Sequence, residues 1–238
     1  METMINNALF VTGTGTSVGK TYFCARFLNF LKIKGIQAGY QKWVATGVDA
    51  GLPEDLVVCL DAASISPSPE LIKQQAPYCF RFPASPHLAA EMEDKNVDPE
   101  VITETYNDLA ARYDLLIVEG VGGILVPLRR DLLLADLLAI LQPKTLVVAQ
   151  SGLGTINHTL LTLEALRSRK IPVLGVVFSD PETQEDERLV QDNMRVVEET
   201  GFARVFGRMR RQQDAEKAEQ AFMPVGQAIL EQLYHAES

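Results

Sequence analysis

The segment from residue 9 to residue 23 constrains the fold more than any other part of this chain. The apolar run Leu9-Phe10-Val11 leads into Thr12-Gly13-Thr14-Gly15-Thr16-Ser17-Val18-Gly19-Lys20-Thr21, at the start of a predicted amphipathic helix. In a strand, glycine-rich turn and helix, backbone N–H groups and the helix N-terminus surround an anion. The lysine can reach β- and γ-phosphate oxygens, and the threonine hydroxyl can ligate Mg²⁺. The segment is therefore predicted to be a phosphate-binding loop (P-loop).

The spacing of this P-loop is unusual. Five residues separate Gly13 from Gly19, whereas the common pattern has four. Thr14 stands where the common pattern has glycine. The segment is therefore a variant P-loop, which narrows the families that it fits.

The rest of the chain alternates apolar strands with amphipathic helices, which predicts an α/β fold. The continuous apolar run before Glu119 is typical of a parallel strand that is covered on both faces. Residues 49–80 are rich in proline and are predicted to be mostly loop. The pattern predicts a single P-loop NTPase-type domain over residues 1–238, a parallel β-sheet with helices on both faces. The predicted strands cover 36–42, 114–118, 144–150, 173–178 and 203–206. The predicted helices cover 20–34, 54–63, 99–112, 136–141, 185–200 and 223–234. One further helix is predicted to end at 92, and another to contain residues 160–166.

Composition excludes several classes of protein. The chain of 238 residues has a net charge of −9 and 47% apolar residues, enough for a sizeable core, and its isoelectric point of about 4.9 argues against a general nucleic-acid binder. The sequence has no run of about 18 apolar residues that would cross a membrane, and no signal peptide is recognisable at its N-terminus. Three dispersed cysteines are typical of reduced thiols. We expect a cytoplasmic protein without membrane or nucleic-acid partners.

Charged and glycine-rich segments at predicted strand ends are candidate functional residues. Glu119 ends a buried strand at the sheet edge where ligands bind, and a P-loop enzyme needs an acidic metal partner there. Lys42 ends a strand beside the P-loop, although a lysine in that position is more often a solvated charge. Asp55, at a helix start, is ordinarily a favourable charge near the helix dipole. The turn 151–158 could hold an anion such as a carboxylate.

Taken together, these motifs resemble the dethiobiotin synthetase family. The resemblance covers residues 8–207. Its most specific parts are the five-residue spacer of the P-loop and the segment from Gly154 to His158. It implies a homodimeric, Mg²⁺- and ATP-dependent ligase that closes a cyclic urea from 7,8-diaminononanoate and CO₂. The segments are Val11 to Thr21, Lys42-Trp43-Val44-Ala45-Thr46-Gly47, Ser85-Pro86-His87, Val118-Glu119-Gly120-Val121-Gly122-Gly123 and Gly154-Thr155-Ile156-Asn157-His158.

The resemblance also implies roles for particular residues. Lys20 holds the β- and γ-phosphates, and Lys42 faces the carbamate and the γ-phosphate. Thr21, Asp55 and Glu119 match the family's metal ligands. The remaining matches line the nucleotide and diamine sites. They are residues 13–21, Glu119, Gly122, Ser179, Asp180, Gly207, Arg208 and Met209 for the nucleotide, Thr16, Thr46 and Ser85 for the diamine, and Gly154, Thr155, Ile156 and Asn157 for its carboxylate across the dimer interface.

The chain departs from the family pattern at several positions. Gly15 replaces an aspartate, and Trp43 replaces the proline that follows the lysine. Ser179-Asp180 replaces the base-reading Asn-Asp pair, and Gly207-Arg208-Met209-Arg210 replaces Gly-x-Ile-Pro. Because both base-binding segments differ, we expect relaxed nucleotide use, with CTP or GTP accepted beside ATP. The charged stretch 208–217 is otherwise expected to be a solvated surface, although its arginine cluster could lie near a nucleotide.

Three alternatives remain open at the level of sequence. The cobyrinic acid amidase group shares the five-residue spacer, but its members carry a further amidotransferase domain with a nucleophilic cysteine. Partitioning-type regulatory ATPases normally carry an additional lysine where this chain has Gly13-Thr14-Gly15. The third alternative is a regulatory or nucleotide-sensing P-loop ATPase of dethiobiotin-synthetase type without synthetase activity, since a fold and a motif do not prove a function.

Overall fold

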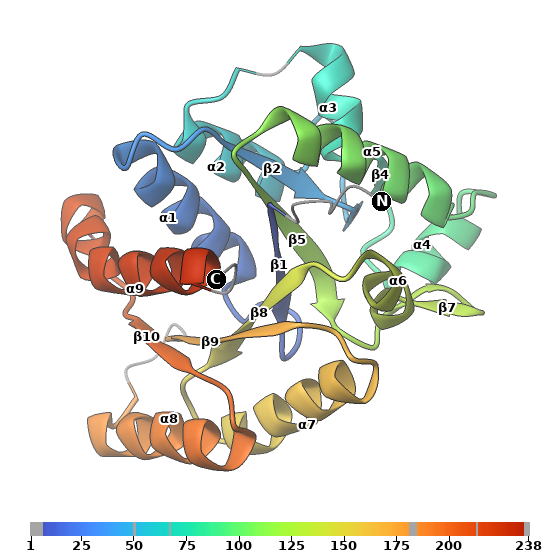
Figure 1. The fold of residues 1–238 in the computed structure, drawn as a ribbon. Coiled ribbons are helices and arrows are strands. Elements are labelled where there is room, and N and C mark those ends of the chain that lie inside the picture. Colours follow the sequence, from blue (N-terminus) through green and yellow to red (C-terminus); the bar gives the residue numbers. More distant parts are fainter. Residues whose placement is uncertain (1–6, 50, 67, 181–184, 213, 236–238) are drawn as a thin grey trace.

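The core of the molecule is one parallel β-sheet (Figure 1). A computed structural model describes residues 7–49, 51–66, 68–180, 185–212 and 214–235. Its six-stranded sheet has the order β10-β9-β8-β1-β5-β2, and all neighbouring strands are parallel. The predicted parallel sheet is therefore confirmed. The strands are β1 (Ala8–Gly13), β2 (Ala38–Lys42), β5 (Leu115–Gly123), β8 (Lys144–Gln150), β9 (Val173–Ser179) and β10 (Val205–Met209).

Helices cover both faces of this sheet, as the alternating pattern predicts. Successive strand side chains point to opposite faces, so Leu9 and Val11 of β1 join one core while Ala8 and Phe10 join the other. The first core lies against α1 (Lys20–Ile33), α2 (Glu54–Ala63) and α9 (Ala215–His235). The second lies against α4 (Pro86–Glu91), α5 (Pro99–Arg112), α6 (Leu134–Leu141), α7 (Thr155–Ser168) and α8 (Glu187–Gly201).

Several predicted boundaries hold because local chemistry sets them. The prediction for α2 matches both of its ends. At the start of α5, the Asp98 side chain accepts a hydrogen bond from the Glu100 N–H at 2.9 Å. Pro99 occupies the first turn of α5, where the missing N–H of proline costs nothing. Caps of this kind depend only on neighbouring residues, so the sequence alone reveals them.

The segment 49–80 contains more regular structure than its prolines indicate. After α2 it forms α3 (Pro69–Gln75) and β4 (Tyr78–Phe80), and β4 pairs in parallel with β3 (Val44–Thr46). Pro69 lies in the first turn of α3, where proline is favourable, and the Ser68 hydroxyl accepts from the Leu71 N–H. The loop prediction is therefore wrong for these residues.

Other boundaries also differ. The final helix begins at Ala215 rather than 223, because buried Ala218 and Phe222 extend its apolar face by two turns. Strand β5 continues beyond Glu119 to Gly123. A short antiparallel pair, β6 (Pro127–Arg129) and β7 (Leu132–Leu133), precedes α6 and was not predicted.

Trp43 is fully buried between the sheet and α5. Its ring lies 4.9 Å from that of Phe10 and 6.2 Å from that of Tyr106, between ring centroids. The indole N–H donates to the Gln41 side-chain oxygen at 3.0 Å. The departure from proline at this position therefore places a large side chain in the core, directly after Lys42.

Trp43→Ala is expected to lower the free energy of unfolding by about 3–5 kcal/mol, because it removes a large buried ring. Urea denaturation measures this change. Phe202→Ala, at a position that is 86% exposed, serves as the control and should change stability by less than about 0.5 kcal/mol. Similar losses for the two variants would contradict a core role for Trp43.

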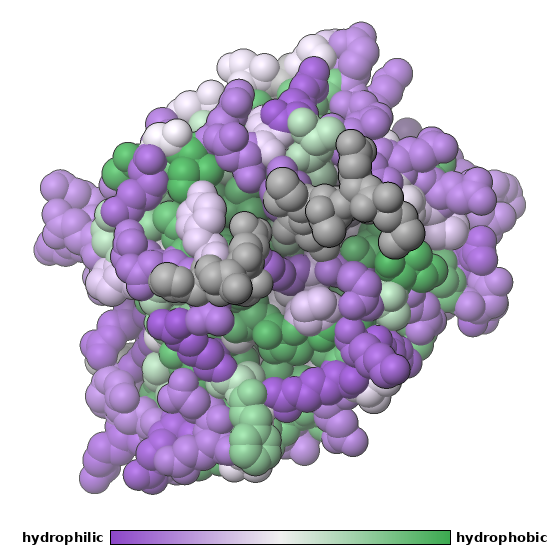
Figure 2. Space-filling model, viewed as in Figure 1, coloured by the Kyte–Doolittle hydropathy of each residue, from purple (hydrophilic) through white to green (hydrophobic). Residues whose placement is uncertain are grey.

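The surface is mainly polar on the face shown in Figure 2, where hydrophilic residues fill most of the rim and hydrophobic residues show in patches nearer the centre. Among the described residues, no helix is both long enough and apolar enough to span a bilayer.

Candidate active site

The carboxyl ends of the central strands bring the candidate residues together. Lys42 on β2 lies directly opposite Glu119 on β5, and Glu119 is also the register partner of Val11 on β1. The P-loop leaves β1 two residues after Val11, and α1 begins at Lys20. Parallel pairing therefore places Lys42, Glu119 and the P-loop at one edge of the sheet, as predicted for a ligand site.

Glu119 is the centre of this cluster. Its side chain is 1% exposed. One carboxylate oxygen, Oε1, accepts hydrogen bonds from Lys42 Nζ at 2.6 Å and from Thr21 Oγ1 at 2.9 Å. The other, Oε2, accepts from the Tyr40 hydroxyl at 2.9 Å. These donors compensate the cost of burying the carboxylate.

Asp55 enters the cluster from α2. It accepts from Thr21 Oγ1 at 2.8 Å, and its Oδ2 lies 2.7 Å from Lys42 Nζ. A hydroxyl has one hydrogen, so Thr21 donates to Asp55 or Glu119 at any moment but not to both. Burial alone would raise the pKa of Asp55, but the Lys42 ammonium, the hydrogen bond from Thr21 and the charge of Lys20 together outweigh burial and lower that pKa.

Two lysines with different environments lie at this edge. Burial would lower the pKa of Lys42, but the carboxylates of Glu119 and Asp55 outweigh it and raise that pKa above its ordinary value. Lys20 Nζ instead donates to the Gly15 carbonyl at 2.8 Å. Burial, followed by repulsion from Lys42, lowers the pKa of Lys20 to about 8. The charge of Lys42 is thus paired with carboxylates of the protein, whereas the ammonium of Lys20 contacts the backbone of the P-loop.

The oxygen donors suit a hard divalent cation. Among the described residues, no group of three or more His, Cys, Asp and Glu side chains is arranged to hold a metal. The available set is one hydroxyl, from Thr21, and two carboxylates, from Asp55 and Glu119. Mg²⁺ in phosphate-transfer sites takes one or two carboxylates and completes its shell with waters and substrate phosphates. The donor set therefore fits Mg²⁺ that arrives with a nucleotide.

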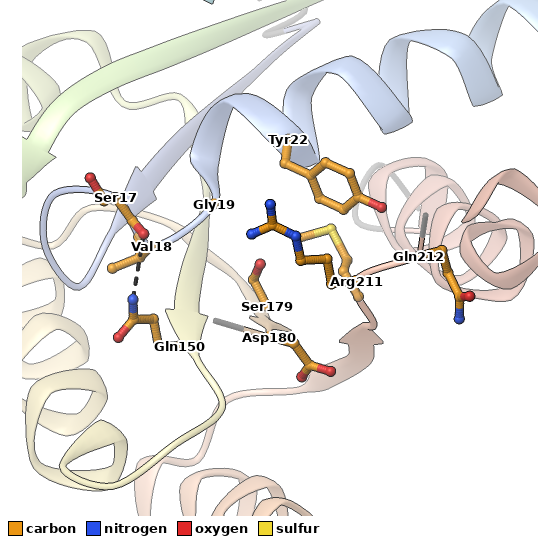
Figure 3. Close-up of a pocket in the computed structure, with 10 residues that line it drawn as sticks. Ser17, Val18, Gly19, Tyr22, Gln150, Ser179, Asp180, Arg211 and Gln212 are labelled. Carbon is orange, nitrogen blue, oxygen red and sulfur yellow. Dashed lines mark hydrogen bonds between the residues drawn. The ribbon is translucent and has the colours of Figure 1, made fainter. Parts of the chain in front are cut away.

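A pocket of about 750 Å³ opens beside the P-loop (Figure 3). In Figure 3 the side chains of Tyr22, Ser179 and Arg211 border this space, and Gln150 donates to the Ser17 carbonyl at 3.4 Å. The predicted nucleotide residues Ser17, Val18, Gly19, Ser179, Asp180 and Met209 line the pocket, together with Tyr22, Gln150, Arg211 and Gln212. Its size and its place next to the P-loop suit the base and sugar of a nucleotide.

Arg208 differs from the prediction of a solvated surface. Its side chain is only 8% exposed, and its guanidinium donates to Asp180 Oδ1 and to Glu187 Oε2. Gly207 and Arg208 lie on β10 just before Met209. The prediction is wrong for Arg208 because two carboxylates offer the buried guanidinium partners. Arg211, by contrast, is exposed and lines the pocket.

The residues expected to bind the diamine lie on four segments, which are the P-loop, the end of β3, the residue before α4 and the start of α7. Thr16 borders Gly122, since its hydroxyl lies 3.7 Å from where a Cβ on Gly122 would be. Thr46 ends β3, which packs against α4, and Ser85 immediately precedes α4 with its hydroxyl 3.0 Å from His87 Nδ1. The segment Gly154, Thr155, Ile156 and Asn157 opens α7, and its binding of an anion stays a prediction.

Sequence reasoning missed Tyr40 and the pocket residues Tyr22, Gln150 and Gln212, whereas Arg211 belongs to the arginine cluster that was expected to be able to lie near a nucleotide. Tyr40 precedes Lys42 by two residues on one strand, so both side chains leave β2 on the same face. That period-two spacing is the signal that could have identified Tyr40. The missed pocket residues Tyr22, Gln150 and Gln212 carry no comparable local pattern.

Comparisons with known proteins show which proteins this chain is similar to. A family model described as "AAA domain" matches residues 7–219. Proteins named ATP-dependent dethiobiotin synthetase are similar along most of the chain. One from Methanococcus vannielii is 37% identical and covers 84% of this chain and 91% of its own. One from Agrobacterium fabrum is 39% identical over 84% of both chains, and one from Methanocaldococcus jannaschii is 34% identical over 87% of this chain and 96% of its own.

Similarity to solved structures extends to more distant proteins. The ParA protein pnob8 ParA superposes with a TM-score of 0.58 at 12% identity and covers 97% of this chain and 99% of its own. A ParA family ATPase from Chlorobium tepidum gives 0.55 at 13% identity, with the same coverage. At such low identity the likeness establishes only the P-loop NTPase-like fold.

Proposed function

This chain belongs to the dethiobiotin synthetase family and is an ATP-dependent ligase of biotin synthesis, and we propose that it closes the ureido ring of dethiobiotin from 7,8-diaminononanoate and CO₂. The observation that carries the proposal is the meeting of Lys42, Thr21 and two carboxylates beside the P-loop lysine. Phosphoryl transfer needs this kind of site, because it depends on positioning and charge neutralisation.

The proposed reaction has three steps. One substrate amine adds to CO₂, forms an N–C bond and releases a proton, which gives a carbamate. A carbamate oxygen then attacks the γ-phosphorus, the bond to the β–γ bridging oxygen breaks, and ADP leaves a carbamic–phosphoric anhydride. The second amine attacks the anhydride carbon, inorganic phosphate departs, and loss of a proton completes the cyclic urea.

The chain's own residues would hold the reactants in place. Lys20 would bind the β- and γ-phosphates, and Lys42 would face the carbamate oxygen and the γ-phosphate. Thr16, Thr46 and Ser85 would line the diamine pocket. The N-terminus of α7, at residues 154–157, would bind the substrate carboxylate, since helix N-termini favour anions. In this proposal the turn reaches the substrate of a second copy of the chain in a homodimer.

Thr21, Asp55 and Glu119 would hold the metal in this proposal. When bound, Mg²⁺ would neutralise charge on the β- and γ-phosphates. The buried position of Glu119 and its hydrogen bond from Tyr40 would keep that carboxylate in a fixed orientation.

The test is ADP release by the full-length protein with ATP, Mg²⁺ and bicarbonate, with and without 7,8-diaminononanoate. The proposal expects a large diamine-dependent increase and dethiobiotin as the product, identified by mass spectrometry. ATP turnover that ignores the diamine would instead support a regulatory ATPase. Repeating the assay with CTP and GTP tests relaxed nucleotide use, which a strict requirement for ATP would refute.

Thr21→Val is expected to raise the Mg²⁺ concentration for half-maximal ADP release by at least about tenfold, because valine keeps the shape of threonine but removes the hydroxyl ligand. A Mg²⁺ titration at saturating ATP measures this effect. Thr103→Val, which removes a hydroxyl that donates to the Pro99 carbonyl in the first turns of α5, is the matched control. Equal Mg²⁺ requirements in both variants would remove Thr21 from the metal site.

A further inference from the structure

Polar side chains outside the cluster of Lys42, Thr21, Asp55 and Glu119 hold the turn between β8 and α7 (residues 151–154). Ser151 Oγ donates to Asp180 Oδ1 at 2.8 Å. From α8, Asn193 Nδ2 donates to the carbonyls of Ser151 at 3.0 Å and Gly152 at 3.4 Å. Ser151 is 0% and Asn193 4% exposed. The first half of the turn is therefore fixed from two sides.

The Asp180 carboxylate that receives Ser151 is itself fixed. Arg208 donates to the same oxygen, Oδ1, and its Nη1 donates to Glu187 Oε2 at 2.7 Å. The side chains of Arg208 and Asp180 are 8% and 13% exposed. Figure 3 shows the Asp180 carboxylate pointing away from Tyr22 and Arg211. This orientation directs the Asp180 carboxylate toward the turn and β10 instead of the space beside Tyr22.

Backbone hydrogen bonds also join the carboxyl ends of β8, β9 and β10, where these side chains lie. The Ser151 N–H donates to the Ser179 carbonyl at 3.0 Å, and the Asp180 N–H donates to the Met209 carbonyl at 3.1 Å. The end of β8 is therefore tied to that of β9, and the end of β9 to that of β10. The side-chain hydrogen bonds from Arg208 and from Ser151 to Asp180 connect the same three strand ends and reach into the turn.

We propose that Ser151, Asp180, Arg208 and Asn193 are positioning residues that set the place of the α7 N-terminus for the substrate carboxylate. The inference rests on the function proposed above for residues 154–157. The N–H groups of a helix N-terminus bind an anion only when they point at it, and the attraction falls off within the first turn. The 151–154 turn leads directly into α7, so loosening it misaligns those N–H groups.

The position of the network predicts which kinetic constant changes. Ser151 does not line the pocket beside the P-loop, and its partner Asp180, which does, still accepts from Arg208 when the Ser151 hydroxyl is removed, so nucleotide affinity should stay close to that of the wild type. In the proposed function, the amines that react beside Lys20 and Lys42 are at the opposite end of the diamine from its carboxylate. Loss of the network should therefore weaken diamine binding and leave turnover at saturating diamine nearly unchanged.

The experiment compares Ser151→Ala with the full-length wild type. We expect the KM for 7,8-diaminononanoate to rise by about tenfold, the effect of losing one well-placed interaction, with kcat within about twofold. Calorimetry with a non-hydrolysable ATP analogue should give an unchanged nucleotide Kd and a weaker diamine Kd. Ser168→Ala, which removes an exposed hydroxyl at the other end of α7, is the matched control.

Asn193→Leu provides a second variant, because leucine keeps the approximate size of asparagine and removes its amide group, including the donor to the turn. It should raise the diamine KM in the same direction. An unchanged diamine KM in folded Ser151→Ala protein overturns the inference, as does an equal loss of nucleotide and diamine affinity. A wild type without diamine-dependent ADP release refutes the proposed function itself, an outcome that the variants are not needed to detect.

Discussion

Replacing Lys42 with methionine is expected to lower kcat by at least about 100-fold, because in the proposed reaction Lys42 supplies positive charge where phosphoryl transfer develops negative charge. Methionine keeps the length of the side chain and removes its ammonium. In the free protein that ammonium lies 2.6 Å from Glu119 and 2.7 Å from Asp55. Diamine-dependent ADP release at saturating ATP and diamine measures the effect.

The same substitution is expected to affect stability. Lys42 and Glu119 form a buried pair, with side chains that are 6% and 1% exposed. Removing one partner of such a pair costs about 3–5 kcal/mol, since the other charge stays buried without compensation. Urea denaturation with and without Mg²⁺ and a non-hydrolysable ATP analogue therefore accompanies the kinetics, to identify conditions under which the variant is folded.

Lys95→Met is the matched control for Lys42. Lys95 also forms an ion pair, with Glu93 at 2.8 Å, but its side chain is 57% exposed. Exposed pairs contribute little, so stability should change by less than about 1 kcal/mol, and kcat should stay unchanged. A folded Lys42→Met protein with kcat within threefold of the wild type would remove Lys42 from the catalytic site.

Gly19→Ala is expected to weaken nucleotide binding by about 10- to 100-fold. Gly19 has φ of +97°, a conformation that costs a residue with a Cβ about 1–3 kcal/mol. A Cβ at this position would also lie 2.4 Å from the Ser179 hydroxyl oxygen and 3.0 Å from the Ser179 Cβ. The P-loop must therefore shift at the residue that immediately precedes Lys20. Calorimetric titration with ATP and Mg²⁺ measures the loss.

Gly35→Ala separates backbone strain from an effect on the site. Gly35 has φ of +73°, but a Cβ there would meet nothing within 4 Å. It should lower stability through strain and leave nucleotide affinity unchanged. Combining Gly19→Ala with Ser179→Ala removes the hydroxyl that the new Cβ meets, and should recover part of the affinity. Equal nucleotide affinity in the Gly19 and Gly35 variants would refute the argument.

The order of elements could be predicted because its signals are local. The P-loop glycines, the continuous apolar run before Glu119 and the cap at Asp98 each depend on a few neighbouring residues. Parallel pairing then places strand ends at one edge, which is why Lys42 and Glu119 could be predicted to approach the P-loop. The role of Asp55, in contrast, came from family resemblance, because one acidic residue at a helix start has no distinctive local pattern.

Short elements and the ends of helices were less predictable, because tertiary contacts decide where they form. Proline counts predicted loop over 49–80, yet β4 forms there because β3 offers it a partner. The start of α9 at Ala215 depends on whether Ala218 and Phe222 find a core to enter. The strand that pairs with β4 and the core that receives α9 come from residues far away in sequence, so neither composition nor periodicity predicts these contacts.

The sequence by itself determined a P-loop, a parallel sheet and the edge at which ligands bind, since these follow from backbone requirements and apolar periodicity. Only the tertiary structure decided which charges meet. Thr21 reaches Asp55 across 34 residues and Glu119 across 98, and Arg208 turns inward to Asp180 across 28. A buried charge requires a partner, and packing across the sheet determines which partner lies within reach.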